Sequence, residues 1–477
     1  MKLTIIGGGI AGLSAAYHAT KKLPNAEITL IEADSRWGGK ISTERVNFDG
    51  GRFIVEGGPD TFLAAKPWGV ALCRELGLGE RLHGTNPNKK NTYVLNKGRL
   101  LPLPDGLAMM IPSDVSSILR SRLISWLGKT RMGLDFLLPA KAVNGDESLG
   151  AFISRRLGRE AYENLIEPLM SGIYAGDGDQ LSLASTFPYL RDLETKYGSL
   201  ARGAIETRKK MPAAPGSRSA FLTPTTGLAE IVEALVARLE SHHVNLRLNT
   251  RVTAVTHNVE RGTWNVTLDT ESLDTETLDT DSLILATPAP VSGRLLASFD
   301  PELASTLQGI PYASTATVSL AYRQSDLVHP LDGYGYVIPR REGRKALACT
   351  WTSTKFPHRA PEGYALLRVF VGRAGQDIPW NENDLLELAK EEMKLTMDIA
   401  AEPIFSRVFL WESAMPQYNL GHPEKLAQIE LALEEYFTLA LAGNGYRGIG
   451  IPDCIRSGEL AVEKVTRDLS RATAKAA

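Results

Sequence analysis

Residues 2–40 read KLTIIGGGIAGLSAAYHATKKLPNAEITLIEADSRWGGK, and this stretch decides the fold. Residues 3–6 form a short apolar run that is typical of a buried strand, and residues 28–31 form a second one. Between them lie a glycine-rich turn and a segment rich in alanine and serine, which predicts a helix packed closely on a sheet. Strand, turn, helix and strand within about 30 residues indicate a βαβ unit that binds a dinucleotide.

The glycine turn has the spacing G-x-G-x-x-G. Gly7 allows a tight turn, Gly9 lets a pyrophosphate approach the backbone, and Gly12 lets the helix pack closely on the sheet. The helix N-terminus then presents free N–H groups and a positive dipole end to the phosphates. Glu32 follows the second strand, where an acid accepts hydrogen bonds from ribose hydroxyls. We therefore expect the cofactor to contact Gly7, Gly8, Gly9, Ile10, Ala11, Gly12, Glu32 and Ala33.

Three further motifs favour a flavin over a nicotinamide cofactor. RWGGK (36–40) resembles the second fingerprint of the FAD-dependent amine oxidase superfamily. DSLILATP (281–288) is similar to that superfamily's strand ending in A-T-P or A-T-G, and AGN (442–444) with GIGIPD (448–453) is similar to its C-terminal flavin-ring segment. The resemblance implies non-covalently bound FAD, and it adds Arg36, Gly38, Gly39, Lys40, Gly448, Ile449, Gly450 and Ile451 to the expected contacts.

Longer strings narrow the resemblance to the protoporphyrinogen/coproporphyrinogen oxidases. They are EGGPDTFL (56–63), ENLIEPLMSGIYAGD (163–177), CTWT (349–352), WESAMPQY (411–418) and GIPDCI (450–455). The similarity runs essentially end to end and is strongest with the Gram-positive branch, which acts on coproporphyrinogen III. It extends the expected FAD contacts to Glu56, Gly57, Gly58, Pro59, Val252 and Trp411.

The resemblance implies an oxidase of haem biosynthesis. Six electrons would leave a porphyrinogen in three two-electron steps, with O2 as acceptor and H2O2 as product. The implied reaction is oxidation of coproporphyrinogen III to coproporphyrin III; protoporphyrinogen IX oxidation is the alternative, and a flavin amine oxidase is a further one. A non-enzymatic relative of the GDP-dissociation inhibitors is disfavoured, because those proteins have lost the flavin fingerprints. The flavin carries the chemistry, so we expect no acid–base catalytic residue.

For the substrate we expect contacts with Lys66, Gly172 and Ile338. Lys66 follows the GPDTFL string and can pair with a propionate. The Gly172 backbone either faces the flavin ring or serves only as a turn. Weaker propionate candidates, for which a solvated loop charge is the simpler interpretation, are Arg340, Arg341, Arg344 and Lys355. Asp60 stands where mitochondrial-type members of the family have an arginine, which favours coproporphyrinogen as the substrate.

Composition excludes several classes of protein. Lys and Arg number 53 against 55 Asp and Glu, a net charge of −2, which argues against nucleic-acid binding. The 3 cysteines show no disulfide or metal-site spacing, which indicates a reducing compartment. The sequence has no apolar run near the ~20 residues of a membrane helix. We expect a cytoplasmic enzyme without a metal; peripheral membrane contact and hand-over to a ferrochelatase-type enzyme stay open. Within the apolar and basic stretch 100–138, the expected helix 114–126 either packs on its own core, which is the simpler interpretation, or forms a lipid-facing or substrate-entry surface.

The pattern along the chain predicts an α/β fold with α+β insertions. A Rossmann-type FAD-binding domain is expected from residues 1–85, 221–295 and 406–477, a helical insertion at 86–220, and a substrate-binding sheet domain at 296–405. Helices are expected at 114–126, 148–170, 228–240 and 382–398, and a last one from about Gly458. Strands are expected at 245–248, 250–257, 281–288, 315–322, 335–338, 346–350, 365–371 and 437–442. The acidic repeat at 268–283 is expected to form exposed hairpin strands.

Overall fold

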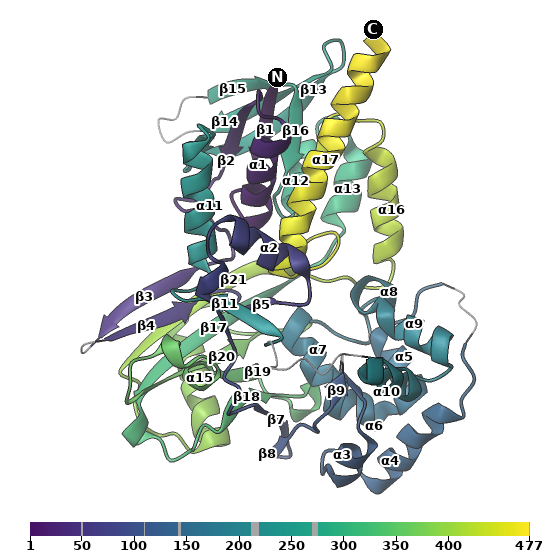
Figure 1. Ribbon diagram of the computed structural model, residues 1–477, viewed down its shortest axis with the longest axis vertical. Helices are drawn as coiled ribbons and strands as arrows, with labels where there is room; N and C mark the ends of the chain where they lie inside the picture. Colours follow the sequence, from purple (N-terminus) through teal and green to yellow (C-terminus); the bar gives the residue numbers. More distant parts are fainter. Residues whose placement is uncertain (49–50, 109, 142–144, 211–218, 270–274, 477) are drawn as a thin grey trace.

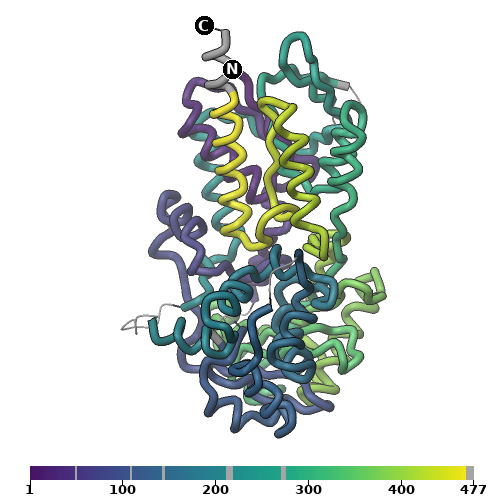
Figure 2. The backbone as a smooth tube through the Cα atoms, turned by 90° about the vertical axis from the view of Figure 1, so that its right-hand side faces the viewer, coloured from purple at the N-terminus to yellow at the C-terminus, as the bar shows by residue number. Residues whose placement is uncertain are grey.

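A computed structural model describes residues 1–48, 51–108, 110–141, 145–210, 219–269 and 275–476. One half of the molecule is an α/β layer structure that contains both chain termini at its far end (Figure 1). The other half consists of a β-sheet part and a helical part that lie side by side (Figures 1 and 2). The predicted α/β class with inserted sheet and helical regions is confirmed.

The α/β half is built on a parallel five-stranded sheet in the order β12-β2-β1-β16-β22. These strands are β12 (Asn245–Arg247), β2 (Glu27–Ile31), β1 (Lys2–Ile6), β16 (Ser282–Leu285) and β22 (Leu439–Leu441). Ile5 pairs with Leu30 on one side and with Ile284 on the other. The sheet therefore joins segments from the beginning, the middle and the end of the chain.

Helices cover both faces of this sheet, as burial of a parallel sheet requires. On one face Ile5 shares a core with α1 (Ile10–Lys22), α2 (Pro67–Glu75), α11 (Ala229–Ser241) and α17 (Ile451–Ala476). On the other face Ile6 shares a core with α12 (Ala289–Leu296), α13 (Pro301–Gln308), α16 (His422–Ala432) and an antiparallel sheet. That sheet contains β13 (Arg251–Asn258), β14 (Thr263–Asp269) and β15 (Thr275–Thr280). β14 and β15 pair as the hairpin predicted for the acidic repeat, of which 270–274 lie outside the described residues.

The start of the last helix differs from the expectation. α17 begins at Ile451 rather than near Gly458. Pro452 is compatible with the first helical turn, where its missing N–H removes no intrahelical bond. Gly458 lies inside the helix, and any side chain there would overlap the carbonyl oxygen of Ala11 in α1. Gly458 thus allows α1 and α17 to pack closely instead of starting a helix.

The sheet part is a seven-stranded sheet in the order β21-β17-β20-β19-β18-β7-β8. Its strands are β21 (Phe405–Pro416), β17 (Tyr312–Arg323), β20 (Tyr364–Val371), β19 (Ala346–Trp351), β18 (Gly333–Val337), β7 (Asn91–Asn96) and β8 (Arg99–Pro102). Helix α15 (Glu382–Met397) packs its apolar side chains on one face, and the short α14 (Thr352–Lys355) follows β19. The pairings of β7 with β18 and of β21 with β17 cross two of the expected domain boundaries.

The helical part contains α3 (Val115–Arg120), α4 (Trp126–Gly133), α5 (Leu149–Leu157), α6 (Arg159–Ala161), α7 (Glu167–Tyr174), α8 (Leu183–Thr186), α9 (Pro188–Tyr197) and α10 (Leu200–Lys210). The helix expected at 114–126 is interrupted, because Ser121 takes an extended conformation and Ser125 caps the next helix. The helix expected at 148–170 is broken at Gly158, whose φ is 92°, and continues through a π-helical turn at Tyr162–Ile166. Buried Arg156 links these elements through its ion pair with Asp135.

The shorter strands connect the larger parts. β3 (Thr43–Phe48) and β4 (Gly51–Glu56) form a hairpin, β9 (Leu107–Ala108) pairs with β10 (Ile111–Pro112), and β11 (Phe221–Pro224) lies between β5 (Phe62–Leu63) and β6 (Leu82–Gly84). No helix among the described residues is long and apolar enough to cross a membrane. In the same part of the chain, no cluster of three metal-ligating side chains occurs.

Candidate functional site

The glycine turn between β1 and α1 has the geometry of a phosphate cradle. Gly7 has φ +109° and its Cα lies against Ala286, where a side chain would come 2.6 Å from the carbonyl oxygen. A side chain at Gly12 would overlap the carbonyl oxygen of Gly7. A Cβ on Gly9 would meet no atom within 4 Å, and Gly9 is the N-cap of α1. The open position at the helix N-terminus is where an anion is bound best.

Glu32 lies directly beside this turn. Its carboxylate accepts hydrogen bonds from the backbone N–H of Gly8 at 2.6 Å and of Asp34 at 2.9 Å. The Thr250 N–H donates to the Glu32 carbonyl, so β13, which carries Val252, begins next to it. Ala33 is exposed at the same strand end. Glu32 and Val252 are therefore brought to the same end of the sheet as the glycine turn.

The RWGGK loop closes over the glycine turn. The Gly38 N–H donates to the Gly8 carbonyl at 2.8 Å, and a side chain on Gly39 would lie 3.2 Å from the Cα of Gly9. Arg36 donates to the carbonyls of Ile41 at 3.0 Å and Gly39 at 2.5 Å. Arg36 therefore fixes the loop, and the glycines leave the space beside Gly9 open.

Lys40, the last residue of this loop, is a buried cation beside the glycine turn. Its ammonium lies 5.8 Å from the centre of the Tyr312 ring. Burial lowers the pKa of Lys40 to about 8. Among the described residues Lys40 forms no ion pair with a carboxylate. Burying an unpaired cation is unfavourable, so this position suits a residue that faces an anionic ligand.

The segment Glu56–Pro59 packs directly on the RWGGK loop. A side chain at Gly58 would overlap the carbonyl oxygen of Lys40. The Trp411 indole N–H donates to the Gly57 carbonyl at 2.9 Å. Glu56 is buried and accepts from the Leu228 N–H at 2.8 Å, which ties the segment to the start of α11. The predicted contacts Glu56, Gly57, Gly58 and Trp411 thus form one continuous wall with Lys40.

The C-terminal glycine segment completes the wall at the start of α17. Gly448 has φ +80°, and Gly450 donates its N–H to the Asp453 carboxylate at 3.2 Å. Asp453 also pairs with Lys66 at 2.6 Å. Lys66 was expected to meet a substrate propionate, whereas the structure pairs it with this carboxylate. Ile449 and Ile451 follow the same turn, with Ile451 buried.

The other two predicted substrate residues differ in exposure. Gly172 lies within α7, so it is not a turn residue, and a side chain there would meet no atom within 4 Å. Its neighbour Ile173, which sequence reasoning did not name, is 45% exposed. Ile338 is 0% exposed and belongs to the sheet core, so its side chain presents no surface to a ligand.

Sequence reasoning also missed a buried charged layer behind Gly57. Arg359 pairs with Glu56 at 2.7 Å, and Lys355 pairs with Asp60 at 3.1 Å. Lys355, Arg359 and Arg368 together hold the pKa of Asp60 at about 2, against an opposing effect of burial. An arginine inside the apolar strand YALLRVFV (364–371) was the available sequence signal.

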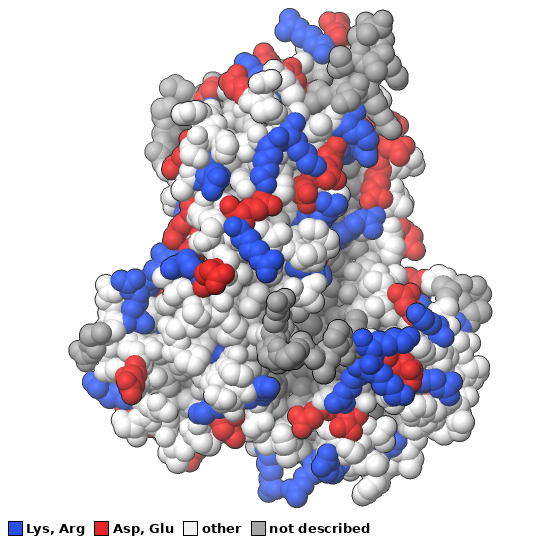
Figure 3. All heavy atoms as spheres, viewed as in Figure 1, with Lys and Arg blue, Asp and Glu red and all other residues white. Residues whose placement is uncertain are grey.

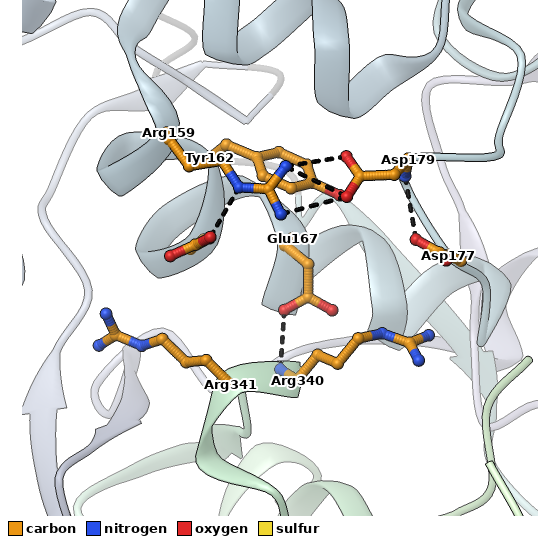
Figure 4. A pocket seen from close by; sticks show the side chains of 8 residues that line it. Arg159, Tyr162, Glu167, Asp177, Asp179, Arg340 and Arg341 are labelled. Atoms are coloured by element: carbon orange, nitrogen blue, oxygen red, sulfur yellow. Dashed lines mark hydrogen bonds and ion pairs between the residues drawn. The ribbon is translucent and has the colours of Figure 1, made fainter. Parts of the chain in front are cut away.

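A separate polar cavity of about 200 Å³ lies between the helical part and the seven-stranded sheet (Figure 4). Its lining residues are Arg159, Tyr162, Glu163, Glu167, Asp177, Asp179, Arg340 and Arg341. Glu167 points down to the Arg340 backbone N–H at 3.0 Å, while Arg159 pairs with Asp179 (Figure 4). The Arg340 guanidinium donates to the carbonyls of Gly176 and Ala374. Glu167 and Arg340 thus hold α7 to the segment that follows β18, whereas Arg159 pairs with Asp179 inside the helical part.

The weaker propionate candidates each contact a different group of the protein. Arg341 donates to Asn96, and Arg344 lies 3.9 Å from the Glu392 carboxylate. On the face seen in Figure 3, basic and acidic side chains intermingle over the α/β half, and basic ones gather over the helical part. These loop cations contact groups of the protein itself, and a role for any of them toward a propionate stays a prediction.

Comparison with known proteins identifies the family. The flavin containing amine oxidoreductase family matches residues 10–466. The chain is 38% identical to coproporphyrinogen III oxidase of Bacillus subtilis (strain 168), over 96% of this chain and 97% of that protein. It is 34% identical to the coproporphyrinogen III oxidase of Staphylococcus aureus, over 98% and 99%. Chloroplastic protoporphyrinogen oxidase of Nicotiana tabacum is 30% identical, over 98% and 86%.

Solved structures agree with this relationship. A crystal structure from Exiguobacterium sp. 255-15, assigned as protoporphyrinogen oxidase, superposes with a TM-score of 0.84 at 33% identity, covering 98% of this chain and 99% of that one. Reduced UDP-galactopyranose mutase has a TM-score of 0.70 at 16% identity, covering 97% and 95%, and shares the fold alone. The chain belongs to the flavin-containing amine oxidoreductase family, in the group that contains the coproporphyrinogen III and protoporphyrinogen oxidases.

Proposed function

We propose that this chain is an FAD-dependent oxidase that converts coproporphyrinogen III to coproporphyrin III, with O2 as the acceptor and H2O2 as the product. The observation that carries the proposal is the 38% identity with a coproporphyrinogen III oxidase over 96% of the chain. The same chain keeps a phosphate cradle that is open at Gly9 and closed by the RWGGK loop. The geometry of the phosphate cradle and the family membership therefore both support a flavin-dependent oxidation.

The residues around Gly9 fit a flavin dinucleotide. The α1 N-terminus and the Gly9 backbone would take the diphosphate, and Glu32 would exchange its backbone hydrogen bonds for the ribose hydroxyls. Lys40 would neutralise part of the phosphate charge from its buried position. The Glu56–Pro59 wall and the turn at Gly448–Ile451 would flank the ring system, since both pack next to Lys40 or α17.

When bound, FAD supplies the redox chemistry by accepting hydride from a bridging methylene carbon of the porphyrinogen. The chain supplies the surfaces that hold the ring and exclude water. Gly172 and Ile173 offer an open, apolar patch of α7 on which a tetrapyrrole macrocycle can lie. Lys66 is 40% exposed while paired with Asp453, so it can turn to a propionate at the rim.

The choice of coproporphyrinogen over protoporphyrinogen rests on carboxylate number and on position 60. Coproporphyrinogen carries four propionates, whereas protoporphyrinogen carries two propionates and two vinyl groups. Asp60 is ionised and is neutralised by Lys355, so this position offers no free cation to a propionate, unlike the arginine of mitochondrial-type members. The additional propionates of coproporphyrinogen are then met by solvent and rim cations such as Lys66.

The experiment presents each porphyrinogen to the purified, FAD-loaded protein. Both substrates are prepared anaerobically, air is admitted, and porphyrin fluorescence is followed against an enzyme-free control. We expect a clear preference for coproporphyrinogen III and three H2O2 formed per porphyrin. A preference for protoporphyrinogen IX would overturn the substrate assignment. No catalysed rise with either, together with turnover of a primary amine, would place the chain among the amine oxidases instead.

Exposed apolar side chains of the helical part suggest where in the cell the enzyme works. Trp126, Leu127 and Leu137 are 71%, 81% and 80% exposed, and the Lys129 ammonium lies 4.5 Å from the centre of the Trp126 ring. We propose a cytoplasmic enzyme that touches anionic membranes through this surface, since exposed aromatic and aliphatic side chains beside basic ones are typical of interfacial binding.

Sedimentation with vesicles of phosphatidylcholine and phosphatidylglycerol tests the proposal. We expect the protein to sediment with the vesicles and the double variant Leu127→Ser, Leu137→Ser to stay in solution. Binding of a ferrochelatase-type enzyme without vesicle binding would assign the surface to product hand-over and overturn the membrane proposal.

A further inference from the structure

Arg368 is a buried charge on the face of the seven-stranded sheet that lies behind Gly57. It is in β20, opposite Ser319 of β17 and Thr350 of β19, and is 2% exposed. Its guanidinium lies 4.7 Å from the centre of the Phe370 ring. The opposite face of the sheet carries the apolar core against α15, so Arg368 projects toward the Glu56–Pro59 wall.

The carbonyl group of Gly57 is the point on which this layer converges. It accepts hydrogen bonds from the Thr317 hydroxyl at 2.8 Å, the Trp411 indole at 2.9 Å and Arg368 Nη2 at 3.1 Å. Arg368 Nη2 also donates to the carbonyl of Gly58. A carbonyl oxygen has two lone pairs, so three donors over-determine its position. The wall beside Lys40 is therefore held rigidly in place by the sheet.

The charges of this layer do not cancel. Glu56 is matched by Arg359 and Asp60 by Lys355. Arg368 has no carboxylate within ion-pair distance in the part of the chain that the structure describes, and its Nε and Nη1 have no hydrogen-bond partner there. Desolvation correspondingly lowers the pKa of Arg368. Three cations against two carboxylates leave one positive charge buried directly behind the predicted flavin wall.

A buried guanidinium that is only partly hydrogen-bonded costs stability, and an apolar residue of similar size would avoid that cost. We propose that Arg368 is the residue that positions the Gly57–Gly58 carbonyls and whose unmatched charge stabilises the reduced, negatively charged form of the flavin. Arg368 acts on the flavin in two ways: its hydrogen bonds fix the Glu56–Pro59 wall, and its positive charge exerts an electrostatic field at the flavin. That field is effective because a charge in a low-dielectric interior is weakly screened. This inference rests on the proposed function only in that it requires bound FAD; it does not depend on which substrate is oxidised.

Flavin reduction potential is the readout, since a purely structural role would leave it unchanged. Arg368→Gln keeps a donor to the carbonyls and removes the charge; Arg368→Met removes both; Arg368→Lys keeps the charge. We expect at least a tenfold shift of the redox equilibrium toward the oxidised form in the Gln and Met variants, which for a two-electron couple is about 30 mV downward. The Lys variant should stay within threefold of wild type.

Two control variants separate the effect of the Arg368 charge on the flavin potential from general effects of altered packing. Arg373 is another buried arginine, and among the described residues its Nε and Nη1 have no hydrogen-bond partner; it lies beyond the end of β20, and its Nη1 is 3.6 Å from the Glu167 carboxylate. Arg373→Met should leave the potential within twofold of wild type. Thr317→Val removes a neutral donor to the Gly57 carbonyl and should shift the equilibrium by less than threefold.

Several results would overturn the inference. They are an unchanged potential in Arg368→Gln and Arg368→Met, an equal shift in Arg373→Met, or an equal shift in Arg368→Lys. If neither porphyrinogen is converted but the potential depends on Arg368 as expected, the substrate assignment fails and the inference on Arg368 is supported.

Discussion

Two glycines only three residues apart should respond to substitution in opposite ways. A side chain at Gly9 meets no atom within 4 Å, and the residue has φ −69° and ψ 175°, which any amino acid adopts. A side chain at Gly12 overlaps the carbonyl of Gly7 and comes 3.2 Å from the Ala286 Cβ. We predict that Gly9→Asp folds but does not hold FAD, whereas Gly12→Ala loses stability.

The magnitudes follow from the geometry. Aspartate is a slightly better N-cap than glycine, so apo Gly9→Asp should be as stable as wild type or more stable by about 0.3 kcal/mol. A carboxylate about 4 Å from a phosphate costs about 4 kcal/mol at the effective dielectric of a protein surface. That penalty corresponds to about a thousandfold loss of FAD affinity. Overpacking at Gly12, with rigid backbone on the other side, should cost about 3 kcal/mol.

The assay measures visible flavin absorbance per protein and thermal unfolding of each apo variant. Gly9→Ala is the matched control, because it adds a side chain at the same place without charge and should keep part of the yellow colour. Gly9→Asp that purifies with full flavin content would refute the placement of the diphosphate. Gly12→Ala that is as stable as wild type would refute the close packing of α1 on the sheet.

Three further predictions concern pH and charge. FAD affinity should fall above pH 8, because Lys40 has a pKa of about 8 and then loses its proton; titration of FAD binding should show no such fall in Lys40→Met. The folded-state pKa of Asp60 is about 2, so its stabilisation is complete above its unfolded value near 3.9 and is lost as the pH falls toward 2. Asp60→Asn should lower the free energy of unfolding in urea by about 2 kcal/mol at pH 7, and an unchanged value would contradict the Lys355 pairing. Burial, Arg359 and His83 lower the pKa of His358 to about 4, so the fold should lose stability as the pH falls from 6.5 to 4; His358→Gln should flatten the unfolding temperature over that window.

Local patterns predicted the dinucleotide-binding elements well. The strand, turn and helix at residues 2–22 depend on neighbours in the chain, and the structure places them as expected. The family strings also led to Lys40, Gly57 and Trp411, which the structure brings to one wall. That these three residues lie together could not be predicted from any one string, because their proximity depends on how three distant segments of the chain pack.

Non-local pairing explains most of the differences. β7 and β21 have ordinary strand sequences, and no local pattern indicates that β7 pairs with β18 or that β21 pairs with β17 in the seven-stranded sheet. The last helix was expected from about Gly458, whereas α17 begins at Ile451: Pro452 suits the first helical turn, and Gly458 suits close packing on α1. Lys66 was expected to meet a substrate propionate, and no local pattern indicated its pairing with Asp453, which lies near the other end of the sequence.

The central claim is that FAD bound at this cradle oxidises coproporphyrinogen III. Its most direct test is the reductive half-reaction: oxidised, FAD-loaded protein is mixed with coproporphyrinogen III without oxygen, and flavin absorbance is followed beside porphyrin formation. We predict rapid bleaching of the flavin, with three flavins reduced for each coproporphyrin III formed. Flavin that stays oxidised in the presence of excess coproporphyrinogen III would contradict the account.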